Sequence, residues 1–276
     1  MEIIGVSDKV DNFVTTVIIT AVIKFRIMVT AEEIEACLVA EGCEEQRRHL
    51  MRFFKTGPGD YGEGDEFLGL RVPQTRLVVR EAKGQVALEE IEKLIGSRWH
   101  ECRLAGFLLL VEEMKAALPK KTDRDDSKAR RREELARFYL RHARQANNWD
   151  LVDMSCPKIL GYYLLYRPGG EDFSLLTRLA ESSNLWEQRI AMVTNWMLIR
   201  HGIYGPAFQV ADILLPHPHD LIHKATGWML REVGKRDCDL MLDYLEKNYR
   251  RMPRTALRYA IEKLPEPQRL YWLNRE

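Results

Sequence analysis

Three short segments of the chain carry tryptophan, aspartate and arginine at helical spacing. Residues 149–153 read WDLVD, residues 185–192 read LWEQRIAM, and residues 224–235 read KATGWMLREVGK. Trp149 and Asp153 are four residues apart, and Trp228 and Arg231 are three apart, so each pair would share one face of a helix. An aromatic ring beside a carboxylate can form a platform for a ligand, because both groups attract positive charge.

Each pair also has a purely structural interpretation. Trp149 and Asp153 are compatible with a buried indole next to a solvated acid. Arg189 alone can be a solvated residue or an ion-pair partner, and the stem of Arg231 can cover a partly buried Trp228. The recurrence favours function: three successive segments place such residues near the same end of a helix, so in a helical array they could converge on one groove.

The expected scaffold is a helical repeat. Four segments that resemble one another each open an expected helix with a bulky residue, and these residues are Trp99, Trp149, Trp186 and Ile222. The intervals between them are 50, 37 and 36 residues, and a charged insertion at 120–132 accounts for the longest. Two-helix units of about 40 residues are typical of HEAT-type arrays. We therefore expect an all-α, HEAT-like solenoid (an α-α superhelix) whose concave side forms a continuous groove.

The chain is expected to have a short extension before its helical domain. Residues 13–28 are apolar, but Lys24 and Arg26 interrupt them before they reach the length of a membrane span, and no convincing signal peptide is present. We assign residues 1–28 to an N-terminal extension and 29–276 to the repeat domain, in which Thr30 caps the first helix. A helical pattern over 32–54 ends at Gly57-Pro58-Gly59, and Pro73 suits a first helical turn.

Composition restricts the classes of function. The chain has 276 residues, 46% of them apolar, and a net charge of +1, so any surface for nucleic acid must be local. Its five cysteines (Cys37, Cys43, Cys102, Cys156 and Cys238) form no CxxC pair and no Cys/His cluster, which suggests reduced thiols in a cytoplasmic protein. The motifs of phosphate-binding loops, serine hydrolases and zinc proteases do not occur.

The histidines do not predict a metal site. His100, His142 and His201 are interpreted as surface or helix-end residues, and His217-Pro218-His219 lies in a proline-rich turn without a clustered third ligand. We therefore expect no metal and no cofactor.

Taken together, these motifs resemble the DNA alkylation repair proteins of the AlkD type. That family carries W-D-x-V-D, L-W-x-x-R and G-W-x-L-R motifs, and FLGLRVP at 67–73 also matches its F-x-G-[ILV]-[RK]-x-P pattern. The resemblance extends from about residue 30 to 235, with a looser continuation beyond. It implies that the following residues line a DNA-binding cleft: Trp149, Asp153, Arg189, Trp228 and Arg231.

The resemblance also implies a reaction, the hydrolysis of the N-glycosidic bond to a purine alkylated at N3 or N7. Such a base is cationic and leaves with little general-acid help, while the deoxyribose acquires oxocarbenium character. Asp153 would stabilise that cation and could position the attacking water. Trp149 and Trp228 would pack on the sugar and backbone. The family holds the duplex across its concave face without inserting the base into a deep pocket.

The expected partner is therefore double-stranded DNA that contains alkylated purines, bound by a monomeric protein without a membrane anchor. Arg189 and Arg231 would bind phosphates that flank the lesion, with Lys224, Lys158 and Arg103 as weaker candidates. A HEAT-like array without catalytic activity, which binds DNA or protein, is the alternative. Asp153 argues against it, because a scaffold has no need for a carboxylate inside a phosphate-binding groove.

Overall fold

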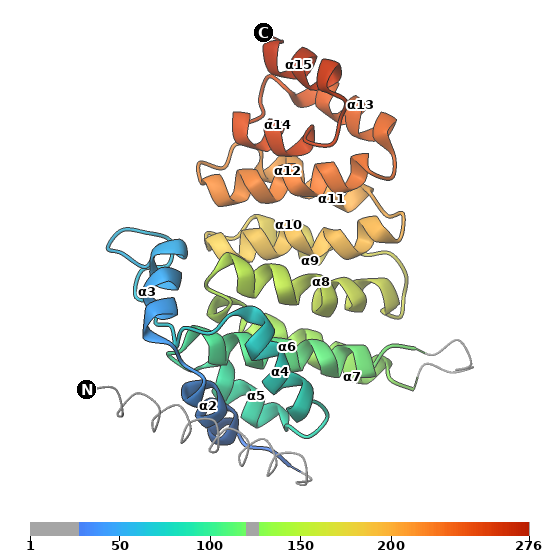
Figure 1. Ribbon diagram of the computed structural model, residues 1–276. Helices are drawn as coiled ribbons and strands as arrows, with labels where there is room; N and C mark the ends of the chain where they lie inside the picture. The colour runs from blue at the N-terminus through green and yellow to red at the C-terminus, as the bar shows by residue number, and fades with distance from the viewer. Residues whose placement is uncertain (1–27, 120–126, 276) are drawn as a thin grey trace. The chain divides into compact units, whose positions relative to one another are not determined.

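The computed structural model describes residues 28–119 and 127–275, and the regular secondary structure in these ranges is helical (Figure 1). The described residues form fourteen α-helices and one 3-10 helix without a β-strand, and Glu66 and Trp99 form an isolated bridge. The all-α prediction is confirmed. The expected extension at 1–28, apart from Met28, and residues 120–126 of the expected charged insertion lie outside the described residues.

The chain divides into two compact units. Unit 1 contains the described residues up to Ala116 together with Gln145–Leu151, and unit 2 contains the remainder. The helices of unit 1 are α2 (Ala31–Ala40), α3 (Glu44–Phe53), α4 (Val72–Ala82), α5 (Leu88–Ile95) and α6 (His100–Ala116). Those of unit 2 are α7 (Ala129–Arg141), α9 (Ser174–Ala180), α10 (Leu185–Arg200), α11 (Gly205–Leu214), α12 (Asp220–Gly234), α13 (Cys238–Asn248), α14 (Arg254–Ala260) and α15 (Glu266–Asn274). The 3-10 helix η1 (Ala143–Gln145) and helix α8 (Trp149–Tyr166) have residues in both units.

Unit 1 is built around α6. This helix packs against α2, α4 and α5, and residues 102–111 are buried on every face, as expected of a helix that is apolar all round. The expected cap is present: the Thr30 hydroxyl accepts from the Glu33 N–H, and the Glu33 carboxylate accepts from the Thr30 N–H. Pro73 lies in the first turn of α4, as predicted.

The helical pattern over 32–54 is interrupted, so it forms two helices rather than one. The chain turns between Ala40 and Glu44, and there the Cys43 N–H donates to the Leu68 carbonyl at 3.1 Å. A Cβ at Gly42 would lie 3.1 Å from that same carbonyl oxygen, so the close approach of the two segments favours glycine. Helix α3, which follows the turn, has no buried residue.

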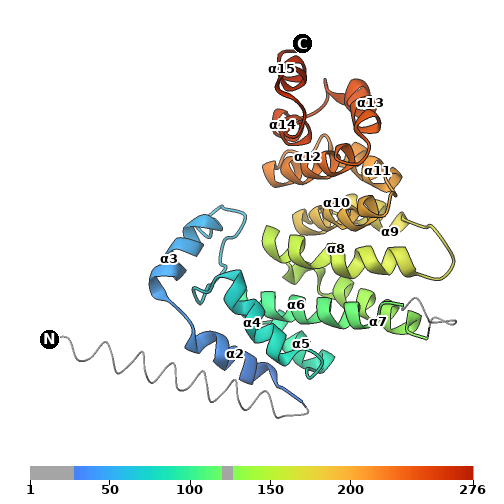
Figure 2. The same ribbon diagram turned by 45° about the vertical axis from the view of Figure 1, so that its right-hand side comes forward.

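Unit 2 stacks helices in successive layers, which Figures 1 and 2 show from two directions. Helix α10 packs against α9, α11 and α12, and α12 packs against α13 and α14. The four repeat-like segments open α6, α8, α10 and α12, as the sequence predicted. These helices have 17, 18, 16 and 15 residues and alternate with shorter ones, which gives the expected two helices per repeat.

Two glycines allow helices of unit 2 to approach each other closely. A Cβ at Gly161 of α8 would lie 2.5 Å from the Cβ of Met197 on α10, and one at Gly227 of α12 would lie 2.3 Å from the carbonyl oxygen of Ala256 on α14. Among the described helices, none has the length and apolar character that a membrane crossing would require.

Candidate functional site

Asp153 and Arg189 form a bidentate ion pair in unit 2. The Arg189 Nε donates to Asp153 Oδ1 at 2.9 Å, and its Nη2 donates to Oδ2 at 2.7 Å. The Arg189 side chain is 6% exposed and that of Asp153 is 16% exposed. A planar guanidinium fork holds a carboxylate in a defined orientation, so Arg189 fixes the acid while part of it remains open to solvent.

The same arginine reaches the start of α12. Its Nη1 donates to the Leu221 carbonyl at 2.6 Å, so all three nitrogens of its guanidinium group donate hydrogen bonds within the protein. These contacts fix the orientation of Arg189 and, through it, that of the Asp153 carboxylate. Its predicted contact with a DNA phosphate stays a prediction.

The other predicted residues of α12 are partly accessible. Trp228 is half-buried, and the Arg231 guanidinium forms an ion pair with Glu262. Lys224 is 40% exposed and contacts the Asp220 carboxylate at 2.7 Å. Lys158, on α8, is half-buried. Unit 2 thus contains the Asp153–Arg189 pair, which the structure brings into direct contact, and these further predicted residues on its helices.

Trp149 lies in an aromatic cluster of unit 1. Its ring stacks on Phe54 at a centroid distance of 5.3 Å and meets Phe53 edge-on at 5.9 Å. Phe54 in turn stacks on Phe67 at 5.1 Å. Trp149 is itself only half-buried, so the cluster supports one side of the indole.

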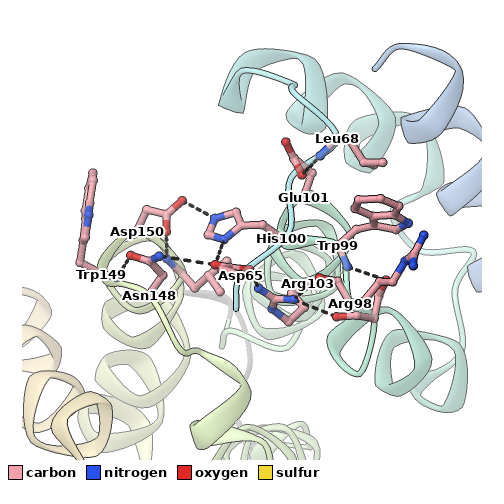
Figure 3. A network of polar contacts seen from close by, with 12 residues as sticks. Asp65, Leu68, Arg98, Trp99, His100, Glu101, Arg103, Asn148, Trp149 and Asp150 are labelled. Carbon is pink, nitrogen blue, oxygen red and sulfur yellow. Dashed lines mark hydrogen bonds and ion pairs between the residues drawn. The ribbon is translucent and has the colours of Figure 1, made fainter. Parts of the chain in front are cut away.

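Beside this cluster, His100 sits between two carboxylates (Figure 3). Its Nδ1 lies 2.8 Å from Asp65 Oδ2 and its Nε2 lies 2.9 Å from Asp150 Oδ2, and all three side chains are at most 3% exposed. Burial alone would lower the pKa of His100, but the charges and hydrogen bonds of Asp150 and Asp65 outweigh it and raise this pKa to about 9. The ring is therefore cationic at neutral pH.

The network also fixes the neighbouring backbone. Asn148 donates to Asp65 at 3.4 Å and accepts from the Trp149 N–H at 2.9 Å. The Glu101 carboxylate accepts from three successive amides, those of Leu68, Gly69 and Leu70, at 2.8 to 3.0 Å. At the start of α6, Glu101 thereby holds the segment before α4, and His100 holds the start of α8 through Asp150.

Arg103 belongs to this network. Its guanidinium is buried, forms an ion pair with Asp65, and donates to the Ser97 and Arg98 carbonyls at 2.9 Å. These contacts favour a structural role, and the predicted contact of Arg103 with DNA stays a prediction.

Sequence reasoning missed the His100 network. The three histidines were expected to be surface or helix-end residues, and all three stand at helix ends: His100 begins α6, His142 follows α7 and His201 follows α10. His100 and His142 are also buried, which the sequence did not indicate. The partners of His100 are 35 and 50 residues away, a separation that no local pattern reports. The one local signal was a histidine and two charged residues (His100, Glu101 and Arg103) at the start of an apolar helix.

Within the described ranges, no group of three or more histidine, cysteine or acidic side chains could hold a metal ion. In the proline-rich turn, His219 instead caps α12: its Nδ1 accepts from the Leu221 N–H at 3.1 Å.

Comparison with known proteins shows what this chain is similar to. A solved structure from Enterococcus faecalis, described as a predicted DNA alkylation repair enzyme, aligns with a TM-score of 0.58 and 15% identity. The alignment covers 82% of this chain and 97% of that one, and at such low identity it shows the fold alone. No curated protein matches the sequence. The family model for DNA alkylation repair enzymes matches residues 34–264. Because this match spans most of the chain, the protein belongs to the DNA alkylation repair enzyme family.

Proposed function

We propose that the protein is a monofunctional DNA glycosylase that hydrolyses the N-glycosidic bond of cationic N3- or N7-alkylated purines in duplex DNA. Its family supports a role in the repair of alkylated DNA. The proposal of a glycosylase reaction rests on the Asp153 carboxylate. Both of its oxygens accept hydrogen bonds from Arg189, and its side chain is still partly exposed.

The chemistry of the lesion explains why one carboxylate would suffice. Alkylation places a positive charge on the purine, so the base leaves without a proton from an acid. The sugar then carries oxocarbenium character, which a fixed anion stabilises. Because Arg189 prevents rotation of the carboxylate, Asp153 needs little reorganisation as that charge develops, and it can also orient the attacking water.

The remaining predicted residues take supporting roles in this proposal. Trp149 and Trp228, both half-buried, pack on the sugar and backbone near the lesion and add attraction to positive charge. Arg231, Lys224 and Lys158 neutralise phosphates, which positions the duplex without reading its sequence. Arg189 acts chiefly through Asp153.

The test is release of free base from alkylated duplex DNA by the purified protein in the presence of a metal chelator. Asp153→Asn keeps the size of the side chain and removes its charge, and we expect it to lower the single-turnover rate about 100- to 1,000-fold. Asp172→Asn is the matched control, because that carboxylate is 50% exposed and pairs with Arg167 in a loop of unit 2.

Two other outcomes would count against the proposal. Equal rates for Asp153→Asn and the wild type would remove Asp153 from the reaction. DNA binding without base release by any of the proteins would support the alternative function, a DNA-binding helical scaffold without catalytic activity.

A further inference from the structure

Leu221 connects Arg189 to the N-terminus of α12. Its carbonyl accepts the hydrogen bond from Arg189 Nη1 at 2.6 Å, and its N–H donates to the His219 Nδ1 at 3.1 Å. His219 is the N-cap residue of this helix, with φ of -89° and ψ of 128°. The backbone of Leu221 is therefore held at its amide by an imidazole and at its carbonyl by the arginine that binds Asp153.

We propose that His219 is a positioning residue for Asp153: its neutral imidazole caps α12, fixes the Leu221 carbonyl, and thereby holds the Arg189 guanidinium against the carboxylate. The kinetic consequence of this inference rests on the proposed glycosylase function. The chain of contacts itself belongs to the free protein and can be tested there.

The hydrogen bonds define the protonation state of the His219 ring. A ring nitrogen that accepts from a backbone N–H carries no proton, so Nδ1 of His219 is unprotonated. His217 repeats the arrangement one step earlier, since its Nδ1 accepts from the His219 N–H at 3.0 Å. Protonation of His219 would turn the acceptor into a donor that faces another donor, and the cap would be lost.

A histidine cap also differs chemically from the usual ones. Serine, threonine and asparagine, which are common at this position, do not titrate near neutral pH. An imidazole does. Histidine at this position therefore makes the cap, and with it the support of Arg189, dependent on pH.

The surroundings favour the neutral ring near pH 7. The charged and titratable groups around it are Asp220, His223 and Lys224 of α12, Arg189 of α10, and His217 in the preceding turn. Burial lowers the pKa of His219 below its usual 6.5, and His223, Arg189 and Lys224 act in the same direction, against the opposing effect of Asp220. The cap is thus complete at neutral pH and is lost under acidic conditions.

The test in the free protein uses the Nε–H resonance of Arg189 in ¹H–¹⁵N NMR spectra, assigned through Arg189→Lys. We expect this resonance to persist in His219→Asn, which can still cap the helix, and to shift or broaden in His219→Ala. In the wild type it should broaden as the pH falls below 6.5, and in His219→Asn it should not. The matched control is His201→Asn, at the C-terminal end of α10, which should behave as the wild type.

The second test is the single-turnover rate of base release between pH 5 and 7.5, corrected for spontaneous loss of base. We expect His219→Ala to be slower on the order of tenfold at neutral pH. His219→Asn should retain most of the rate and lose the part of the acid decline that is due to His219. The ratio of wild type to His219→Asn isolates this part from any titration of Asp153.

The outcomes separate the two proposals. An unchanged Arg189 resonance in His219→Ala would overturn the positioning role, and an identical acid decline in wild type and His219→Asn would overturn the role of the titrating ring. If the resonance responds as expected but the wild type releases no base, the glycosylase proposal fails while the positioning chain stands.

Discussion

The His100 network of unit 1 and the Asp153–Arg189 pair of unit 2 both join a cation to carboxylate, but they differ in their access to water. The carboxylates of Asp65 and Asp150 are 1% and 3% exposed, whereas Asp153 is 16% exposed. A fully enclosed network holds the fold and has no surface left for a ligand. A carboxylate that remains partly exposed can contact a substrate, so partial exposure distinguishes the candidate site from the structural network.

The largest expected effect would come from breaking the enclosed network. Asp65→Ala removes the acceptor shared by His100, Arg103 and Asn148. Two buried cations would lose a partner, and breaking a buried pair typically costs about 3–5 kcal/mol. Urea unfolding followed by circular dichroism measures the loss. Asp172→Ala removes an exposed carboxylate that pairs with Arg167 and accepts from the Ser174 N–H at the start of α9, and it should cost only about 1 kcal/mol. An equal effect of both variants would contradict the distinction.

The second prediction concerns the pH dependence of stability. The pKa of His100 is about 9 in the folded protein, against 6.5 as its ordinary value. Its contribution is therefore complete below pH 6.5 and is lost as the pH rises toward 9, by an amount on the order of 3 kcal/mol. We expect the stability difference between wild type and His100→Gln to shrink over that range in urea titrations. A difference that stays constant from pH 6.5 to 9 would show that the ring does not change charge there.

The third prediction concerns the partly exposed pair. Arg189→Lys keeps the charge but removes the fork that fixes both oxygens of Asp153. We expect the rate of base release to fall about 10- to 100-fold, because a mobile carboxylate must be reoriented in each turnover. Single-turnover kinetics measures it, with the far-UV circular dichroism of the variant compared with that of the wild type. An unchanged rate would mean that the ion pair is incidental to catalysis.

The repeat architecture could be predicted from the sequence because its signals are local. Periodicity and capping indicate the starts of the helices near Trp99, Trp149, Trp186 and Ile222. Two residues from separate motifs, Asp153 and Arg189, are in direct contact between two of these helices. Spacing along the chain cannot tell which donors of an arginine are already engaged. The sequence predicted that Arg189 and Arg231 bind phosphates. In the structure, each of them forms an ion pair with a carboxylate.

The same limit explains the residues that sequence reasoning misplaced. The turn between α2 and α3 depends on a hydrogen bond between Cys43 and Leu68, which lie 25 positions apart in the printed sequence. The burial of His100 depends on Asp65, in a loop whose composition alone marks it only as polar and glycine-rich. Such features arise from tertiary contacts, and a single sequence carries no direct record of them.

The smallest expected effect lies at Arg231 and Glu262, an ion pair with side chains 17% and 45% exposed. Pairs open to solvent typically contribute about 0–1 kcal/mol, so Glu262→Gln should hardly change the free energy of unfolding. Its effect on DNA would be more informative. If Arg231 binds a phosphate, Glu262 competes for its guanidinium, and Glu262→Gln should tighten binding to an undamaged duplex while Arg231→Ala weakens it.

Salt dependence would show whether that contact is to a phosphate. Each neutralised phosphate contributes about 0.9 to the slope of log affinity against log salt, so Arg231→Ala should reduce the slope by roughly that amount. Fluorescence anisotropy with a labelled duplex between 50 and about 200 mM salt resolves this difference. An unchanged slope in Arg231→Ala would mean that Arg231 does not bind a phosphate. The Arg231–Glu262 pair would then have a structural role, like the His100 network, and no role in binding DNA.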